Sequence, residues 1–234
     1  MAASSLTSEQ DNRPAVSTAC LVSRVPFDGS GLVGFDDLYQ IEQQLQTGSY
    51  AVVYRVTTKN HQQGLPRQEY AAKIIRRQDL SVSAEKDVHT EVQLMQDLVA
   101  VNGVVKLVDF FANDDFYILV QTLAKGGDLF DRMKATGTYS EREARIVAMK
   151  LLTTIRGLHQ RRTIHRDIKP ENILIENPQD ATSVLLADFG FATCLSEEGF
   201  SRRRCGVRII SQVETRTIPF HTCNLHFLLY DSPK

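Results

Sequence analysis

The sequence predicts an α+β protein of two lobes, in which an antiparallel sheet precedes a group of helices. Apolar and polar residues alternate in the runs "YQIEQQL", "YAVVYRVTT" and "EYAAKIIRR", between Tyr39 and Arg77, as is typical of strands. From residue 140 onward the apolar residues recur at helical spacing instead. We therefore expect a sheet-rich lobe over about residues 38–123 and a helical lobe over about residues 124–206.

The first lobe is expected to contain one helix and two further strands. A polar turn at residues 60–64 separates the second and third strands. A helix is expected over residues 83–100, because its apolar residues recur every three or four positions. These residues are Val88, Val92, Met95 and Val99. The runs "VVKLVDFF" and "FYILVQT" then predict two more strands.

The second lobe is expected to begin its main helix at a capping box. Ser140 followed by Glu143 has the pattern in which each side chain bonds the backbone N–H of the other residue. Apolar residues then recur along residues 140–160, and we expect them to form one buried face. They are Ile146, Met149, Leu152, Ile155 and Leu158.

Composition sets limits on partners and location. Of the 234 residues, 42% are hydrophobic, which is enough for a substantial core, and 27 basic residues nearly balance 28 acidic ones. This balance gives no sign of binding to nucleic acid or to an anionic membrane. The four cysteines contain no Cys-x-x-Cys pair, and no apolar run reaches the length of a membrane span. We expect a soluble, intracellular and cytoplasmic protein without a zinc site.

The run "TIHRDIKPENILI", residues 163–175, carries the strongest chemical signal. It places an acid, a cation and an amide on one tight loop, as Asp167, Lys169 and Asn172. Such a set suits the joint positioning of a hydroxyl, a phosphate and a metal. Downstream, Asp188 in "DFG" offers carboxylate oxygens to a hard cation such as Mg²⁺.

Two further charged residues precede this loop in the chain. Lys73 ends "AAK" on an expected strand, and Glu91 lies on the expected helix, on the side that carries Met95. The ordered set of strand lysine, helix glutamate, His-Arg-Asp loop and Asp-Phe-Gly resembles the protein kinase family. The resemblance covers about residues 45–206 and implies a two-lobed, protein-kinase-like fold with an incomplete helical lobe.

The resemblance implies a serine/threonine kinase that uses ATP and Mg²⁺. By that likeness Lys73 holds the α and β phosphates and is oriented by Glu91, while Asp167 accepts the proton of the substrate hydroxyl. Asn172 and Asp188 are implied to bind Mg²⁺. Lys169 in "IKPEN" is similar to the serine/threonine branch rather than the tyrosine branch.

The adenine site is likewise implied by the resemblance. The backbone of Thr122 and Ala124 is expected to meet the adenine ring, with Gln121 at the inner end of this segment. Asp128 is read equally as a ligand of a ribose hydroxyl or of a substrate arginine, and as the N-cap of a surface helix. The apolar walls are expected to be Leu45, Val53, Ala71 and Leu174, with Ala187 beneath.

The phosphate loop departs from the family pattern. In "LQTGSYAVVYRV" Gln46 and Ala51 stand where the family has its first and third glycines, and only Gly48 remains. We expect a stiffer loop that binds ATP less tightly, because the lost glycines restrict the backbone.

The runs "GGDLFDRM", "HRDIKPENILI" and "LADFGFA" together are most similar to the calcium/calmodulin-dependent kinase group. This similarity implies a protein substrate of unknown identity and allows for a regulatory protein. Neither the substrate nor an upstream activator follows from the sequence.

The two ends of the chain differ from this pattern. Residues 1–37 are rich in small and polar residues and are expected to be a disordered leader. Residues 207–234 lack the family's Thr-Pro-x-Tyr and Ala-Pro-Glu signals, so we interpret them as a tail foreign to the kinase sequence. Ser201, beside arginines, is the nearest hydroxyl to the position at which relatives carry an activating phosphate, here Arg203. Two readings therefore stay open, an active kinase and an ATP-binding or interaction fragment without turnover.

Overall fold

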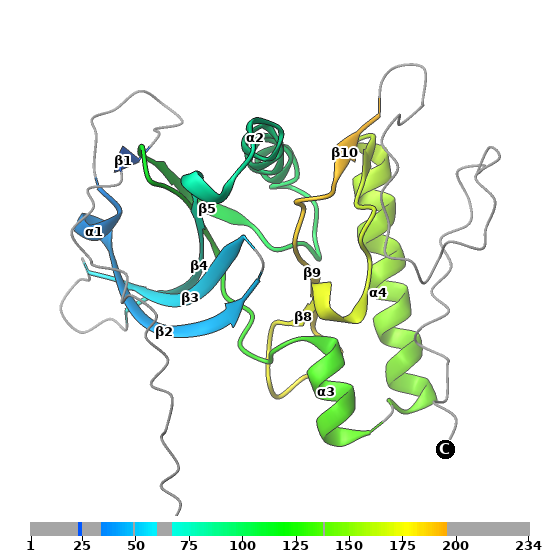
Figure 1. Ribbon diagram of the computed structural model, residues 1–234. Helices are drawn as coiled ribbons and strands as arrows, with labels where there is room; N and C mark the ends of the chain where they lie inside the picture. Colours follow the sequence, from blue (N-terminus) through cyan, green and yellow to red (C-terminus); the bar gives the residue numbers. More distant parts are fainter. Residues whose placement is uncertain (1–22, 25–33, 49, 60–66, 138, 196–234) are drawn as a thin grey trace, which may run out of the picture.

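The computed structural model describes residues 23–24, 34–48, 50–59, 67–137 and 139–195 of the chain. A curved antiparallel sheet with helix α2 forms the first lobe, and helices α3 and α4 with short strands form the second (Figure 1). The predicted α+β class with two lobes is confirmed.

The sheet has six strands in the order β1-β5-β6-β4-β3-β2, and every neighbouring pair is antiparallel. The five strands predicted from the sequence are all present, as β2 Tyr39–Thr47, β3 Ala51–Thr58, β4 Glu69–Arg76, β5 Leu107–Ala112 and β6 Phe116–Thr122. The edge strand β1 Ser23–Arg24 was not predicted.

The first described residues belong to the sheet lobe. Strand β1 pairs with the edge of β5, and helix α1 (Phe35–Leu38) leads directly into β2. The Phe35 ring is only 2% exposed and lies 5.5 Å from the rings of Tyr39 and Phe111. Residues 34–37 thus belong to the packed sheet lobe, although the sequence pattern placed them in the leader. The pattern missed them because a single buried aromatic ring gives no periodic signal. Residues 23–24, also assigned to the leader, form β1. The remaining residues of the expected leader, 1–22 and 25–33, lie outside the described residues.

Helix α2 (Val82–Asp97) begins at Ser81, whose hydroxyl accepts the Ala84 N–H. Val88, Val92 and Met95 are buried as predicted. The prediction for Val99 was wrong, since this side chain is 64% exposed. The helix ends at Asp97 and the chain then turns, so that Leu98 rather than Val99 enters the core.

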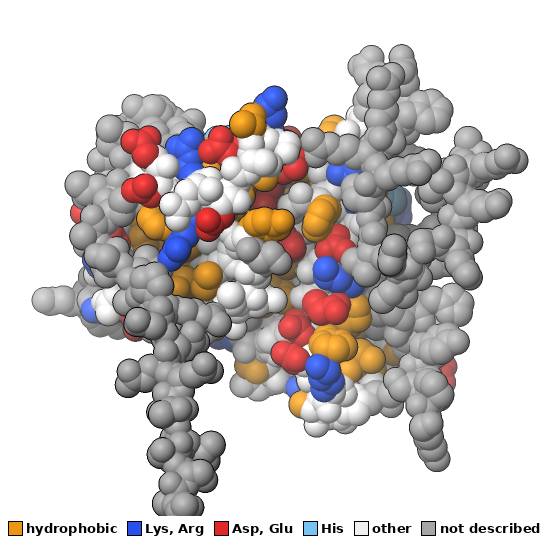
Figure 2. All heavy atoms as spheres, viewed as in Figure 1, with side chains coloured by type: hydrophobic (Ala, Val, Ile, Leu, Met, Phe, Trp, Pro, Cys, Tyr) orange, Lys and Arg blue, Asp and Glu red, His pale blue; other side chains and the backbone are white. Residues whose placement is uncertain are grey.

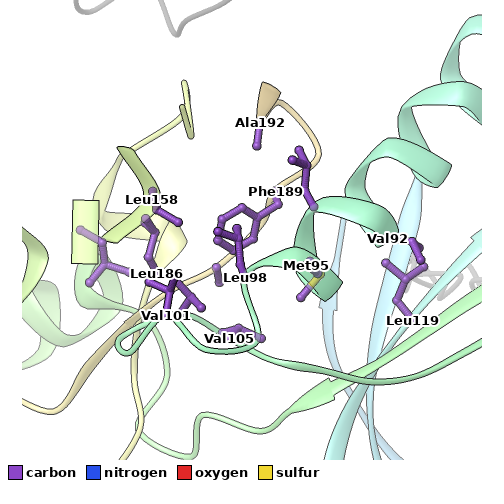
Figure 3. Packing of buried hydrophobic residues seen from close by; sticks show 14 of the residues in the cluster. Val92, Met95, Leu98, Val101, Val105, Leu119, Leu158, Leu186, Phe189 and Ala192 are labelled. Carbon is purple, nitrogen blue, oxygen red and sulfur yellow. The ribbon is translucent and has the colours of Figure 1, made fainter. Parts of the chain in front are cut away.

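One hydrophobic core runs through both lobes. Figure 3 shows Met95 beside helix α2 on one side, Leu158 and Leu186 on the other, and Leu98 and Phe189 between them. All five side chains are at most 5% exposed. Because a close-packed core transmits displacement, the position of α2 is coupled to the segment that carries Phe189.

The described part of the second lobe is built on two helices, two short antiparallel strand pairs (β7 with β10 and β8 with β9) and the turn η2. The capping box at the start of α4 is confirmed, because the Glu143 N–H donates to Ser140 Oγ and the Ser140 N–H donates to Glu143 Oε2. The remaining elements are η1 Arg77–Asp79, α3 Leu129–Thr136, α4 Glu141–Gln160, β7 Thr163–Ile164, η2 Pro170–Asn172, β8 Ile173–Ile175, β9 Val184–Leu186 and β10 Thr193–Cys194.

The predicted single apolar face of α4 was wrong in part. Ile155 and Leu158 are buried, but Ile146, Met149 and Leu152 are exposed. Steps of three residues turn a helix by about 300°, so five such positions drift by about 240° and cannot share one face. The other buried positions of α4 are Ala144, Val147, Leu151 and Thr154.

The linker before β5 packs against α4 through a glycine. Gly103 has φ +79°, and a Cβ atom there would lie 2.0 Å from Thr154 Oγ1. Gly127 has a similar φ of +76° but nothing within 4 Å of the same position. Substitutions at the two glycines can therefore separate the cost of backbone strain from the cost of steric overlap.

We predict that Gly103→Ala lowers the free energy of unfolding by about 2–5 kcal/mol, the sum of a left-handed backbone penalty and overpacking. Gly127→Ala is the matched control and should lower it by only about 1–2 kcal/mol. Chemical denaturation of both variants measures the difference, and equal losses would show that α4 does not press on Gly103.

Candidate active site

Lys73 and Glu91 form an ion pair between the sheet and helix α2. Lys73 lies on the central strand β4, opposite Val53 of β3 and Leu119 of β6. Its Nζ donates to Glu91 Oε1 at 2.7 Å and to Oε2 at 3.0 Å. The Glu91 side chain is 3% exposed and that of Lys73 is 19% exposed, so Glu91 is buried and the pair is largely shielded from solvent at the junction of strand and helix.

Asp188 joins this pair as a second carboxylate. Lys73 Nζ lies 3.2 Å from Asp188 Oδ1. Burial by itself would lower the pKa of Lys73, but the charges of Glu91 and Asp188 outweigh it and hold that pKa above its usual range. Burial would raise the pKa of Asp188, but Lys73 outweighs it and lowers that pKa. Lys73 and Asp188 are therefore both charged near neutral pH.

The loop that carries Asp167 is fixed from within. Asn172 Nδ2 donates to the backbone oxygen and to Oδ2 of Asp167, each at 2.8 Å. Lys169 Nζ lies 2.9 Å from the same Oδ2, and this bond to Asp167 raises the pKa of Lys169. Among the described residues no donor reaches Asp167 Oδ1, so one carboxylate oxygen is left for a ligand.

A short hairpin brings Asn172 and Asp188 to the same place. Strand β8 starts just after Asn172 and β9 ends just before Ala187, and the antiparallel register pairs Ile173 with Leu186. The Ala187 N–H donates to the Asn172 backbone oxygen at 2.8 Å. Asp188 follows with φ +61°, a strained conformation for a residue with a side chain and one that often marks functional sites.

His165 connects the Asp167 loop to the end of the β8–β9 hairpin. Its Nε2 lies 3.0 Å from the Ala187 backbone oxygen, and its ring meets Phe189 at 5.0 Å with an interplanar angle of 66°. Burial lowers the pKa of His165, so the ring is neutral near pH 7 and can donate to this carbonyl. The His165 contacts thus tie the Asp167 loop to the residues on either side of Asp188.

The oxygens of Asn172 and Asp188 fit a magnesium ion. Both nitrogen-donor bonds of Asn172 run to Asp167, which directs its amide oxygen away from that residue. Asp188 Oδ2 has no protein donor among the described residues. Two oxygens from the protein suit Mg²⁺, which keeps phosphate oxygens and waters as its other ligands. No cluster of three His, Cys, Asp or Glu side chains occurs within the described ranges, so no all-protein metal cage competes there.

The residues predicted for the nucleotide gather on one face of the sheet. Val53 lies opposite Lys73, and Ala71 lies two residues before it, so all three side chains share one face. Leu174 lies on β8 in the other lobe and is partly buried, whereas Leu45 on β2 is 46% exposed. The structure therefore brings the predicted apolar residues of β3 and β4 together with Lys73.

The backbone between the lobes is partly engaged. The Thr122 N–H donates to the Lys106 backbone oxygen, whereas the Ala124 N–H has no protein acceptor among the described residues. At the tip of the β2–β3 hairpin the Gly48 N–H donates to the Ala51 backbone oxygen at 2.8 Å. The hairpin is thus closed without the two missing glycines.

Asp128 has the geometry of a helix cap. Its Oδ1 accepts the Asp131 N–H at 2.7 Å at the start of α3. This contact supports the N-cap interpretation, and it leaves Oδ2 for a ribose hydroxyl or an arginine. The ligand role of Asp128 stays a prediction.

One residue of the site was missed in the sequence. Arg166 has φ +68°, and its Nε donates to the Phe191 backbone oxygen at 2.6 Å, which anchors the segment after Asp188. The middle position of the "HRD" run was the available signal. Ser201 and Arg203, named for the position at which relatives carry an activating phosphate, lie outside the described residues.

Where described residues are visible in Figure 2, the surface carries no large patch of side chains with the same charge. Figure 2 shows acidic and basic side chains interspersed with hydrophobic ones on the face seen in Figure 1. Across the described residues, no helix combines the length and hydropathy that crossing a membrane requires.

Residues 39–209 match the protein kinase domain, and the chain belongs to the protein kinase family. It is 33% identical to a probable myosin light chain kinase of Dictyostelium discoideum over 72% of the chain and 50% of that protein. Its identity to human calcium/calmodulin-dependent protein kinase type IV is 32%, over 82% of the chain and 38% of that protein. It is also 32% identical to calcium-dependent protein kinase 7 of Arabidopsis thaliana, over 66% of the chain and 28% of that protein.

The family is that of an enzyme, and these relatives agree with a serine/threonine kinase similar to the calmodulin-dependent group. The chain spans half or less of the length of each of these three relatives. Activity, substrates and partners of the whole protein are therefore matters for proposal.

We predict that Lys73→Met lowers the free energy of unfolding by about 3–5 kcal/mol, because it leaves the buried Glu91 carboxylate without its cation. The double variant Lys73→Met/Glu91→Leu should recover most of this loss, since it removes both charges. Urea unfolding of the three proteins tests the pair. A double variant as unstable as the single one would show that packing, not charge, sets the cost.

Proposed function

We propose that the protein transfers the γ-phosphoryl group of MgATP to a serine or threonine hydroxyl of a protein substrate. The observation that carries this proposal is that two sets of side chains lie at one end of the β8–β9 hairpin. The first set is the Lys73–Glu91 pair with Asp188 beside it. The second set is the Asp167–Asn172 pair. The first set suits a bound triphosphate and the second suits an incoming hydroxyl.

The nucleotide would lie against the sheet face that carries Val53, Ala71 and Lys73. The charged amine of Lys73 would bind the phosphate oxygens, and Glu91 holds this amine in place at 2.7 Å. The Ala124 N–H is open to a ring nitrogen of adenine, because the described residues offer it no acceptor. Apolar walls and one or two backbone bonds are what a planar base requires.

Asn172 and Asp188 would hold the Mg²⁺ ion through their free oxygens. When bound, this ion supplies positive charge that offsets the charge of the phosphates. Asp188 keeps its charge because Lys73 lowers its pKa, so its oxygens are available as ligands at neutral pH.

Asp167 would receive the proton of the substrate hydroxyl on Oδ1. The hydroxyl oxygen forms a bond to the γ-phosphorus, the bond from that phosphorus to the β-phosphate oxygen breaks, and ADP leaves. Asn172 and Lys169 both contact Oδ2. These contacts would orient the carboxylate so that Oδ1 faces the substrate hydroxyl. Lys169, whose amine lies beside Asp167, would also bind the transferring phosphoryl group.

The alternative is a fragment that binds nucleotide without turnover. Gln46 and Ala51, in place of two loop glycines, favour it. The family and the intact set from Lys73 to Asp188 favour the enzyme. We further propose an intracellular, cytoplasmic location, where MgATP is abundant, and a regulatory protein partner, in line with the calcium- and calmodulin-dependent relatives.

Phosphotransfer from radiolabelled ATP to a basic serine peptide tests the proposal. We predict measurable turnover that Asp167→Asn reduces by at least about 10²-fold, because general base catalysis is lost. The same variant should bind nucleotide as the natural protein does. Nucleotide binding without any turnover in the natural protein would establish the alternative instead.

We also predict that Mg²⁺ tightens binding of a fluorescent ATP analogue, and that Asp188→Ala removes most of this gain by deleting a ligand oxygen. Titrations with and without Mg²⁺ measure it, with Asp131→Ala as a control carboxylate outside the site. Equal affinity in both conditions would overturn the assignment of the metal ligands.

A further inference from the structure

Arg77 lies at a junction that the phosphate site does not include. It follows directly after strand β4, four residues beyond Lys73. Its Nε donates to Glu85 Oε1 on helix α2 at 3.0 Å, and its Nη1 donates to the Asn113 backbone oxygen at 2.7 Å. The Arg77 backbone N–H donates to the Asp115 backbone oxygen at 2.9 Å. One residue thus joins β4, α2 and the β5–β6 turn.

The Arg77 side chain also covers an aromatic ring. Its guanidinium carbon lies 4.9 Å from the centre of the Tyr117 ring on β6. Tyr117 in turn meets the His89 ring of α2 at 5.2 Å, and its hydroxyl lies 3.4 Å from Glu85 Oε1. The first half of α2 is therefore held on the sheet by a connected set of polar and aromatic contacts.

These contacts suit arginine better than lysine. A guanidinium is planar, so it can lie over a ring while its edge donates to two acceptors in fixed directions. A lysine at the same position has a single nitrogen and cannot satisfy Glu85 and the Asn113 oxygen with the same geometry while covering Tyr117. The site therefore requires the shape of the group and not only its charge.

The two halves of α2 are secured differently. The half that carries Met95 is buried in the core shared by both lobes, whereas Arg77 and Glu85 are each about one third exposed. Partly exposed ion pairs add little to global stability. They can still select between orientations of a helix, because rival positions differ by small free energies.

We propose that Arg77 is a positioning residue, which sets the orientation of α2 and thereby the contact of Glu91 with Lys73. Glu85 and Glu91 are six residues apart on one helix, about 9 Å along its axis, so a tilt at the first moves the second. The inference rests on the proposed function, in which the Lys73–Glu91 pair prepares the phosphate site.

The test compares Arg77→Gln with Arg76→Gln, a matched loss of one positive charge at the neighbouring residue. The affinity for a fluorescent ATP analogue with Mg²⁺ is measured well below the melting temperature, together with hydrogen exchange along α2. We expect Arg77→Gln to weaken binding by about 3- to 30-fold, to speed amide exchange over residues 85–95, and to leave the melting temperature little changed. Arg76→Gln should leave binding and exchange unchanged.

Two more variants separate positioning from simple structural support. Arg77→Lys should restore only part of the affinity, because it keeps the charge and loses the planar fork. In a Glu85→Gln background, Arg77→Gln should have a smaller effect on binding than in the natural protein, since the shared contact is already lost. Full rescue by lysine, or strictly additive effects, would overturn the assignment.

The outcomes also distinguish this inference from the proposed function. If the natural protein binds no nucleotide, the proposed function fails, and the exchange of α2 amides alone then decides whether Arg77 holds the helix. If the natural protein binds nucleotide and Arg77→Gln changes neither affinity nor exchange, this inference fails while the proposed function stands.

Discussion

The buried pair of Lys73 and Glu91 is the interaction on which the site depends. It links the central strand of the sheet to α2 across 2.7 Å, in a place where an unpaired charge would be costly. Asp188 adds a second carboxylate to the same amine and so brings the β8–β9 hairpin to the sheet lobe. The three charges define where the lobes meet, and the hydrophobic core around Phe189 holds them there.

The two proposed metal ligands are brought together by one small hairpin, β8–β9. Because β8 and β9 are antiparallel, the residue before the first and the residues after the second lie at one end. Asn172 and Asp188 are therefore neighbours although 15 residues separate them in the chain. Asp188 adopts a positive φ, a local strain that the fixed surroundings sustain. The site is thus prepared by backbone geometry before any ligand binds.

Much of this could be predicted from the residues. The alternating runs gave β2 to β4 correctly, the capping box at Ser140 was found, and the pairing of Lys73 with Glu91 followed from strand and helix positions. Local periodicity failed where packing decides exposure. Five apolar residues spaced by three in α4 were read as one face, yet Met149 is 60% exposed, and Val99 lies past the end of its helix.

The sequence by itself determined the class of the protein, because the order of the lysine, glutamate, His-Arg-Asp and Asp-Phe-Gly motifs is a property of the chain. It also determined which groups can carry charge at the site. Only the tertiary structure decided that Phe35 enters the core and that Arg77 joins three elements. Each depends on contacts between residues distant in sequence or on the exact course of the backbone, and no local pattern encodes such contacts.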